Sequence, residues 1–250
     1  MMGMLGKKMG MTQVFGESGE MIPVTVVQVG PCVVTKKRTR DREGYDAVQL
    51  GFGRQKASRL TKAYRGQFEG KNLPLCRHLK EFRLDRDLEL AEGQELTVSA
   101  FKVGDTVHVR GITKGRGFQG VIKRHGMSGG PASHGSDFHR RPGSLGQNSW
   151  PSRIYKNVRL PGHMGVDAVT TRNLTVVAVR PQDHVLLIKG AIPGTRGGLV
   201  EVLNAQSDFL DRDEFKPKQK DASQPAETNR DVESAAGKAE ESARPNENKE

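Results

Sequence analysis

The stretch TVHVRGI at residues 106–112 alternates apolar and polar side chains and decides the fold class. Val107 and Val109 fall on one side of such a strand, because side chains alternate with a period of two. His108 and Arg110 fall on the other side. Further β-rich runs lie upstream at residues 12–15, 21–29, 32–38, 45–52 and 97–99, and downstream at residues 174–179, 185–188 and 199–203. Many short strands, without a strand–helix–strand rhythm, predict a mainly β fold built on an antiparallel barrel.

Two segments interrupt this pattern. Residues 16–19, GESG, supply a hairpin turn between the first two strands. Within residues 55–95, Ser58 can cap a helix, and three large side chains then recur at every fourth position. These are Leu60, Tyr64 and Phe68. We therefore expect a helical insertion at 55–95.

Residues 126–165 have no sustained periodicity and are dense in Gly, Ser, Pro, His and Arg. Structureless segments of this length are rare inside a compact domain and are usually functional or disordered. Charge decides between the two, because residues 110–165 hold ten cations against one carboxylate, Asp137, a net charge of +9. The cations are Arg110, Lys114, Arg116, Lys123, Arg124, Arg140, Arg141, Arg153, Lys156 and Arg159. Such a segment cannot fold on itself, but it can become ordered on phosphates.

The chain of 250 residues carries a net charge of +11. Residues 211–250 contribute −3, with eight basic and eleven acidic side chains, so residues 1–210 carry +14. A field of that size favours a polyanionic partner, most often nucleic acid and less often an acidic membrane. The last forty residues have the composition of a disordered tail. The expected organisation is a barrel domain at 1–54, 96–125 and 166–210, a helical insertion at 55–95, an extended loop at 126–165 and a disordered tail at 211–250.

Cysteine content and hydropathy point to a compartment. Cys32 and Cys76 are the only cysteines, so the sequence offers neither a disulfide framework nor a CxxC metal pair. A reducing compartment follows. No stretch approaches the roughly 20 apolar residues of a membrane span. We expect a soluble, cytoplasmic protein without a membrane partner.

The string ITKGRGFQG at residues 112–120 raises the question of nucleotide binding. Its spacing does not match a P-loop, which ends in Gly-Lys-Ser or Gly-Lys-Thr. Gly115, Gly117 and Gly120 do form GxGxxG, but no acidic residue follows near the required position. A glycine-rich strand-to-loop turn that touches an RNA backbone is the preferred interpretation.

Histidines in this region invite a zinc hypothesis. The four are His125, His134, His139 and His163. Their intervals are irregular and no cysteine joins them, whereas structural zinc uses closely spaced ligand pairs. We therefore expect no metal and no cofactor. Contact with bases or phosphates is the preferred role of His134 and His139.

A hydrolase could pair Ser133 or Ser144 with a neighbouring histidine and Asp137. The sequence has neither a nucleophile elbow nor an oxyanion-hole signature, so this alternative is disfavoured. Trp150, the only tryptophan, either anchors a local cluster or stacks on a base. The basic run at residues 36–40 is equally compatible with a solvated strand edge and with a phosphate contact.

Three motifs together carry a family resemblance. They are LGKKMGMT at residues 5–12, GRGFQG at 115–120 with Arg124 following, and GSLGQ at 143–147. In this order they resemble the bacterial form of large-subunit ribosomal protein L-three, and the resemblance covers about residues 1–204. It implies a translation-factor-like barrel with a helical insertion and a long extension that enters 23S rRNA toward the peptidyl transferase centre. It also implies an early-assembling structural protein on the cytoplasmic ribosome, not an enzyme, with neighbouring large-subunit proteins as partners and a glutamine methyltransferase acting on Gln147.

We accordingly expect the rRNA contacts to come from one basic region. The expected residues are Arg110, Lys114, Arg116, Lys123, Arg124, His134, His139, Arg140, Arg141, Trp150, Arg153, Lys156 and Arg159. Two alternatives remain, a non-ribosomal nucleic-acid-binding protein and an RNA-acting enzyme. An enzyme needs convergent titratable groups, and the lone Asp137 among ten cations argues against one.

Overall fold

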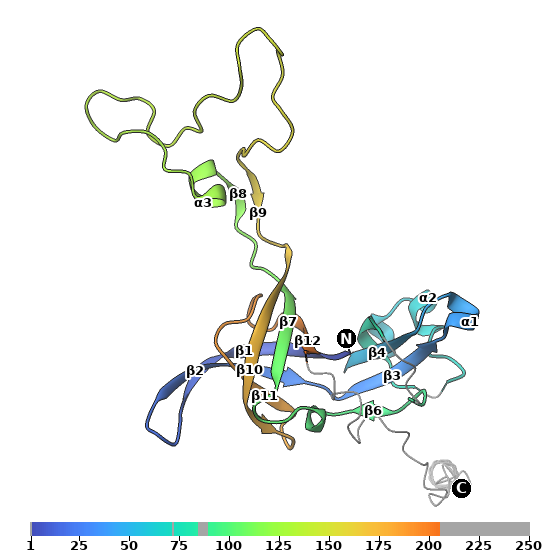
Figure 1. Cartoon of the computed structure of the whole chain (residues 1–250). Helices are drawn as coiled ribbons and strands as arrows, with labels where there is room; N and C mark the ends of the chain where they lie inside the picture. Colours follow the sequence, from blue (N-terminus) through green and yellow to red (C-terminus); the bar gives the residue numbers. More distant parts are fainter. Residues whose placement is uncertain (1, 72, 85–89, 206–250) are drawn as a thin grey trace, which may run out of the picture. The chain divides into compact units, whose positions relative to one another are not determined.

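Six antiparallel strands close into a barrel in the order β1–β12–β7–β10–β11–β2 (Figure 1). They are β1 (Gly3–Phe15), β2 (Met21–Val29), β7 (Thr106–Ile112), β10 (Ala168–Arg180), β11 (Val185–Lys189) and β12 (Leu199–Asn204). The computed structural model describes residues 2–71, 73–84 and 90–205. The predicted tail at 211–250 lies outside these residues. The expected barrel class is confirmed.

The stretch that opened the sequence analysis forms β7 with the predicted boundaries. Val107 and Val109 are fully buried, whereas Arg110 is exposed. Val200 and Val202 of the neighbouring β12 are buried by the same alternation. The prediction for this strand is confirmed because one of its faces packs in the apolar interior while the other meets solvent.

Strand β1 begins nine residues earlier than the predicted run at 12–15. Its glycines resemble turn residues in the sequence, but they permit close approach of neighbouring strands. A Cβ on Gly6 would lie 2.7 Å from the Gln28 carbonyl oxygen, and one on Gly3 would meet the Val202 carbonyl oxygen. Glycine is therefore required inside this strand.

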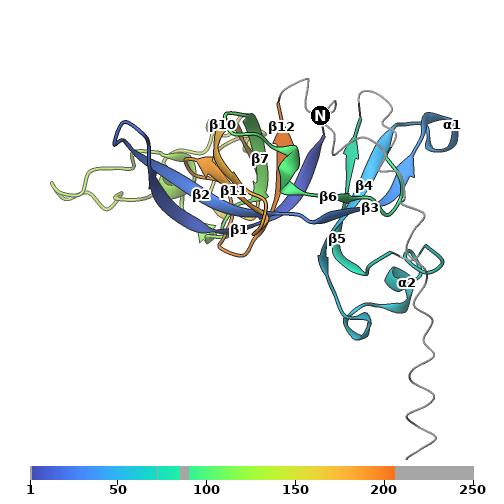
Figure 2. The same cartoon turned by 90° about the horizontal axis from the view of Figure 1, so that it is seen from below.

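A second antiparallel sheet has the order β5–β4–β3–β6 (Figure 2). Its strands are β5 (Cys76–Arg83), β4 (Ala47–Arg54), β3 (Cys32–Arg38) and β6 (Glu95–Leu96). Strand membership thus differs from the expectation for residues 1–54, because β3 and β4 do not join the barrel. One apolar cluster runs through both sheets and includes Leu5, Val27, Leu50 and Leu96. Because both sheets bury apolar side chains in the same core, their strands show the same hydrophobic pattern, and the sequence does not indicate which strand belongs to which sheet.

The predicted helical insertion is only slightly helical. It contains the 3-10 turn η1 (Ala57–Arg59) and the one-turn helix α2 (Lys62–Arg65). Thr61, not Ser58, accepts the capping hydrogen bond from the Tyr64 amide at 3.4 Å. The spacing of Leu60, Tyr64 and Phe68 predicted a longer helix than the one observed, because the helix ends after one turn at Gly66.

Three further short helical elements lie outside the insertion. They are α1 (Arg40–Glu43), the 3-10 turn η2 (Val98–Ala100) and α3 (Val121–His125). The strand expected at 97–99 is wrong, because η2 turns there and buries both Val98 and Ala100. None of the helices in the described ranges is both long and apolar enough to cross a membrane.

Candidate nucleic-acid interface

A two-stranded stem carries the basic segment out of the barrel. β8 (Gly117–Gln119) pairs with β9 (Gly162–Met164), so the chain leaves by β7 and returns by β10 (Figure 1). Backbone hydrogen bonds continue the pairing between barrel and stem, including Thr113 N–H to Asp167 O at 2.9 Å and Arg116 N–H to Met164 O at 2.9 Å. The extension is therefore anchored in the barrel by two strands.

Gly165 allows the two sides of the stem to approach closely. It is buried with φ +84°, and a Cβ there would collide with the Lys114 carbonyl oxygen. Only glycine adopts this conformation without strain and leaves that space open. The glycines of 112–120 were predicted to let a phosphate come close to the backbone. The tightest approach in the stem is instead between the backbone at Gly165 and the backbone at Lys114.

Helix α3 follows the stem and ends in the left-handed Gly126. Lys123, Arg124 and His125 occupy its last turn, where positive charge is favoured by the helix dipole. Arg124 Nη1 donates to the Leu160 carbonyl oxygen at 2.7 Å, and His125 Nε2 lies 3.1 Å from the same oxygen. These contacts close the base of the loop formed by residues 126–161.

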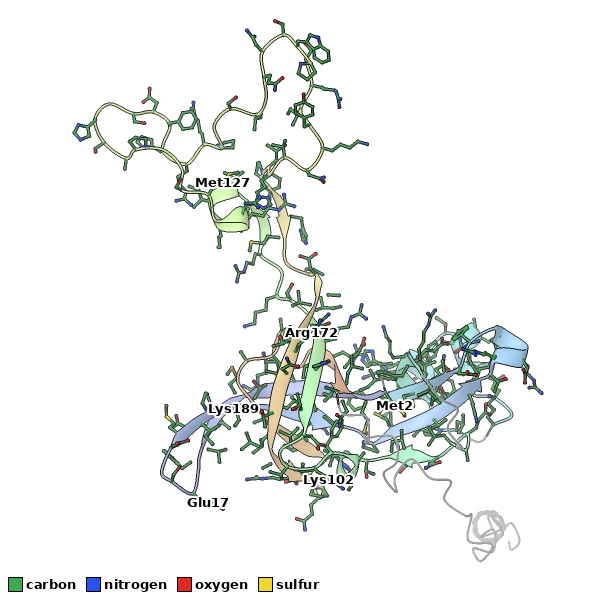
Figure 3. The ribbon with its side chains drawn as sticks, viewed as in Figure 1. Met2, Glu17, Lys102, Met127, Arg172 and Lys189 are labelled. Atoms are coloured by element: carbon green, nitrogen blue, oxygen red, sulfur yellow. The ribbon has the colours of Figure 1, made fainter. Side chains whose placement is uncertain are left out.

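Loop 126–161 has no buried residue, and all of it is described. Its few internal contacts are local, such as Gly130 N–H to the His139 carbonyl at 2.8 Å and Arg153 stacked 5.4 Å from the Tyr155 ring centroid. In Figure 3 its side chains project into open space beyond α3, and Met127, just after that helix, is labelled. The loop thus lacks a core of its own, as the composition predicts.

The predicted contact residues fall into four places. Arg110 lies on the outer barrel surface, opposite Glu201 of β12 in register. Lys114 and Arg116 lie on the stem, and Lys123 and Arg124 lie on α3. The remaining predicted residues are exposed on loop 126–161: His134, His139, Arg140, Arg141, Trp150, Arg153, Lys156 and Arg159. Of these four places, the stem, α3 and the loop form one continuous extension with twelve of the thirteen predicted residues, and Arg110 lies at its foot.

The charges of the extension are uncompensated. None of the ten cations of residues 110–165 forms an ion pair with a carboxylate of the described residues. The second sheet behaves differently, because Arg38 pairs with Glu81 at 2.8 Å and Lys71 with Glu92 at 3.0 Å. A surface of unpaired cations is the electrostatic signature of a polyanion-binding site.

Lys8 is a further cation beside the stem, and it is not among the thirteen residues predicted from the sequence. It lines a hollow of about 480 Å³ at the foot of the stem, together with Lys114, Arg116 and Asp167. Its Nζ donates to the Ile192 carbonyl at 2.7 Å, which holds the ammonium at the hollow. Burial lowers the pKa of Lys8, and repulsion from Lys114 lowers this pKa further. Only the register of β1 places this lysine beside the stem, so no local sequence signal reveals it.

Exposed aromatic rings accompany the cations. Trp150 exposes 80% of its surface and Phe118, on β8, exposes 76%. Phe138 and Tyr155 are also exposed on the loop. The sequence analysis named Trp150 alone. The other rings could have been found by the same argument, since aromatic residues in a segment without a core have few partners besides bases.

The alternative chemistries find no support in this geometry. Among the described residues, no group of three or more His, Cys, Asp or Glu side chains is placed to hold a metal ion. Ser144 Oγ donates to the Gly146 carbonyl oxygen at 3.0 Å, a local turn contact. Both cysteines are buried free thiols, and burial raises the pKa of Cys32 to about 12. Cys32 lies on β3 and Cys76 on β5, so neither thiol belongs to the basic extension.

Comparison with known proteins identifies the family. The family model described as Ribosomal protein L3 matches residues 81–185, which include β7, the whole extension and all of β10. Over 205 residues the chain is 50% identical to the large ribosomal subunit protein uL3 of Brachyspira pilosicoli, covering 82% of this chain and 94% of the relative. The chain belongs to the ribosomal protein L3 family.

Two further relatives of the L3 family agree in extent. The large ribosomal subunit protein uL3 of Syntrophus aciditrophicus is 50% identical over 194 residues, or 78% of this chain and 89% of the relative. That of Geobacter sulfurreducens is 50% identical over 200 residues, or 80% and 95%. The resemblance carried by residues 5–12, 115–120 and 143–147 is thereby confirmed.

Proposed function

We propose that this chain is a structural constituent of the large ribosomal subunit that binds 23S rRNA through its basic extension. Membership of the ribosomal protein L3 family supports the subunit, its rRNA and its proteins as partners, and the cytoplasmic ribosome as the location. The observation that carries the rRNA role is the extension itself, with nine cations, one carboxylate and a loop without buried residues. Surrounding phosphates would supply the counter-charge that the chain lacks.

The mechanism that we propose is binding and ordering of RNA. The barrel fixes the direction of the stem, the cations neutralise crowded phosphates, and Trp150 stacks on an unpaired base. Lys8, Lys114 and Arg116 would bind a phosphate at the foot of the stem. The loop would reach toward the peptidyl transferase centre, and no residue is assigned a catalytic role. We propose boundaries near residues 54, 95, 125, 165 and 210, with β3 and β4 assigned to the second sheet rather than to the barrel.

Gln147 is the proposed substrate of a glutamine methyltransferase. Its side chain is exposed on loop 126–161, next to the turn made by Ser144 and Gly146. An exposed amide in a loop without a core is accessible to a modifying enzyme before assembly. Methylation keeps the amide neutral and removes one N–H donor, so it would change hydrogen bonding without changing charge.

Sedimentation of a cell extract through a sucrose gradient tests both proposals. We expect the tagged chain to migrate with the large subunit, and peptide mass spectrometry of that fraction to show one added methyl on the peptide holding Gln147. The peptide holding Gln119 serves as the unmodified control. A chain found with DNA or free of ribosomes would contradict the rRNA role, and an unmodified Gln147 peptide would contradict only the methylation.

A further inference from the structure

The hairpin formed by residues 9–23 has a charge opposite in sign to that of the extension. It contains Glu17 and Glu20 and no Lys, Arg or His, within residues 1–210 that carry +14. Lys7 and Lys8 end the basic part of β1 just before it. Phosphates would be repelled by such a surface rather than attracted. The hairpin is therefore not a continuation of the cationic extension.

The hairpin also projects beyond its neighbouring strands. Pairing of β1 with β12 ends at Lys7 opposite Leu199, and pairing of β2 with β11 begins at Val24 opposite Lys189. Beyond those points, no further strand of the described residues pairs with the hairpin. Figure 1 shows β1 and β2 running past the other barrel strands, and Figure 3 labels Glu17 at the tip. Both strand edges and both faces are accessible there.

One face of the hairpin is uncovered and bears three large apolar side chains, with the polar Gln13 between Met11 and Phe15. In the β1–β2 register Phe15 lies opposite Met21, and Met11 lies opposite Thr25. Residues directly opposite each other share a face, and alternate residues of one strand do so too. Met21 therefore lies on the same face of β2 as Thr25 and Val27, which are fully buried. The face that lines the barrel interior thus continues past the barrel.

The exposure along this face is large. Phe15 exposes 67%, Met21 60% and Met11 54% of their surfaces. Clustered large apolar side chains on a surface indicate an interaction site, and methionines adapt well to a protein partner. Single exposed residues would carry no such meaning, but here they gather on one side of one hairpin.

We propose that the face of residues 9–23 that bears Met11, Phe15 and Met21 is the docking surface for a basic neighbouring protein of the large subunit. The apolar side chains bury against that protein, and Glu17 and Glu20 pair with its cations. The proposal rests on the ribosomal role proposed above and adds the surface and the kind of partner. The chain then separates its contacts: the extension meets RNA and the hairpin meets protein.

Site-specific photocrosslinking in assembled subunits tests this assignment. Phe15→p-benzoyl-phenylalanine is compared with Phe118→p-benzoyl-phenylalanine, since both side chains are exposed aromatics. We expect position 15 to crosslink to a basic ribosomal protein and position 118 to crosslink to rRNA. A crosslink from position 15 to rRNA or to a second copy of this chain, or no product above the unirradiated sample, overturns the proposal. Failure of position 118 alone would instead count against the proposed rRNA interface.

Charge reversal separates the two kinds of neighbour by sign. With the probe at position 15, Glu17→Lys combined with Glu20→Lys should lower the protein crosslink about tenfold, because it repels a basic partner. If the hairpin faced rRNA, the same change would raise the yield of RNA crosslink. Glu69→Lys combined with Asp183→Lys is the matched control, since both residues are exposed and lie outside the hairpin. The control should leave the yield within about twofold.

Discussion

At the scale of single residues, Trp150 is exposed without a structural reason to be so. It shows 80% of its surface, and loop 126–161 offers it no buried neighbour. Leaving an indole in water forgoes the free energy that its burial would contribute. A base that stacks on the ring recovers that free energy on binding. The exposure of Trp150 thus leads to two expectations: its ring contributes little to the stability of the free chain, and it is available to stack on a base.

Trp150→Ala should weaken binding to the rRNA fragment and leave folding unchanged. The expected loss of binding free energy is about 1–3 kcal/mol, the value of one base on one aromatic face. Filter binding measures the loss, and the thermal unfolding midpoint serves as the second readout. Val103→Ala is the control, because Val103 is also exposed but lies outside the extension. An unfolding midpoint lowered by several degrees would mean that Trp150 anchors a local cluster instead.

The sequence predicted that the site would be built from cations, but it did not predict which groups of the chain those cations contact. Arg124 was expected among the rRNA contacts because it belongs to a cationic cluster. Its guanidinium also donates to the carbonyl of Leu160, thirty-six residues away. No local pattern encodes that contact, since it depends on how the loop returns. Lys8 was missed for the same reason, because β1 brings it to the stem from the other end of the sequence.

At the scale of elements, loop 126–161 is separable from the barrel by its lack of core contacts. The stem is closed by β8–β9 pairing and by the contact of Arg124 with Leu160. Replacing residues 127–158 with a short Gly-Ser linker retains both features. We expect the unfolding midpoint to stay within about 2 °C, which corresponds to less than roughly 1 kcal/mol. Differential scanning fluorimetry of the two proteins measures this.

The same shortened chain should fail in assembly. It lacks Arg140, Arg141 and the Trp150 ring, so large subunits made with it should sediment as immature particles or show low peptide-bond formation. A variant that extends the loop by inserting the same linker after Gly126 controls for the linker itself. If the shortened protein unfolds, the loop contributes to the core. If it folds and supports normal assembly, the extension is not where the function lies.

Strand prediction succeeded where one face of a strand is buried. β2, β3 and β7 have the boundaries that alternation and turn residues indicate. It failed at β5, an edge strand with four charged side chains among eight residues, because solvated edges tolerate charge and lose the alternating pattern. The predicted helix failed for the opposite reason. Its large side chains had helical spacing, but the helix ends after one turn at Gly66.

At the scale of the whole molecule, charge is sorted by position. Residues 110–165 carry +9 of the +14 found on residues 1–210, and the hairpin at 9–23 carries −2. Some cations elsewhere are paired, as Lys80 is with Glu201 at 3.2 Å. A paired cation releases few counterions on binding RNA, because its charge is already compensated. The extension should therefore account for most of the salt dependence of rRNA binding.

This expectation gives a predicted change in the salt slope of rRNA binding for each variant. Each phosphate contact contributes roughly 0.7–0.9 to the slope of log affinity against log salt, a value for DNA applied here to RNA. Arg140→Ala combined with Arg141→Ala should lower the slope by roughly 1.5, and excision of 127–158, which also removes Arg153 and Lys156, by roughly 3. Arg42→Ala combined with Arg59→Ala removes the same charge from exposed sites outside the extension and should lower it by less than half as much. Filter binding across a salt series measures all four proteins. Equal slopes for the two arginine pairs would show that net charge alone, and not the arrangement of the extension, governs binding to the rRNA.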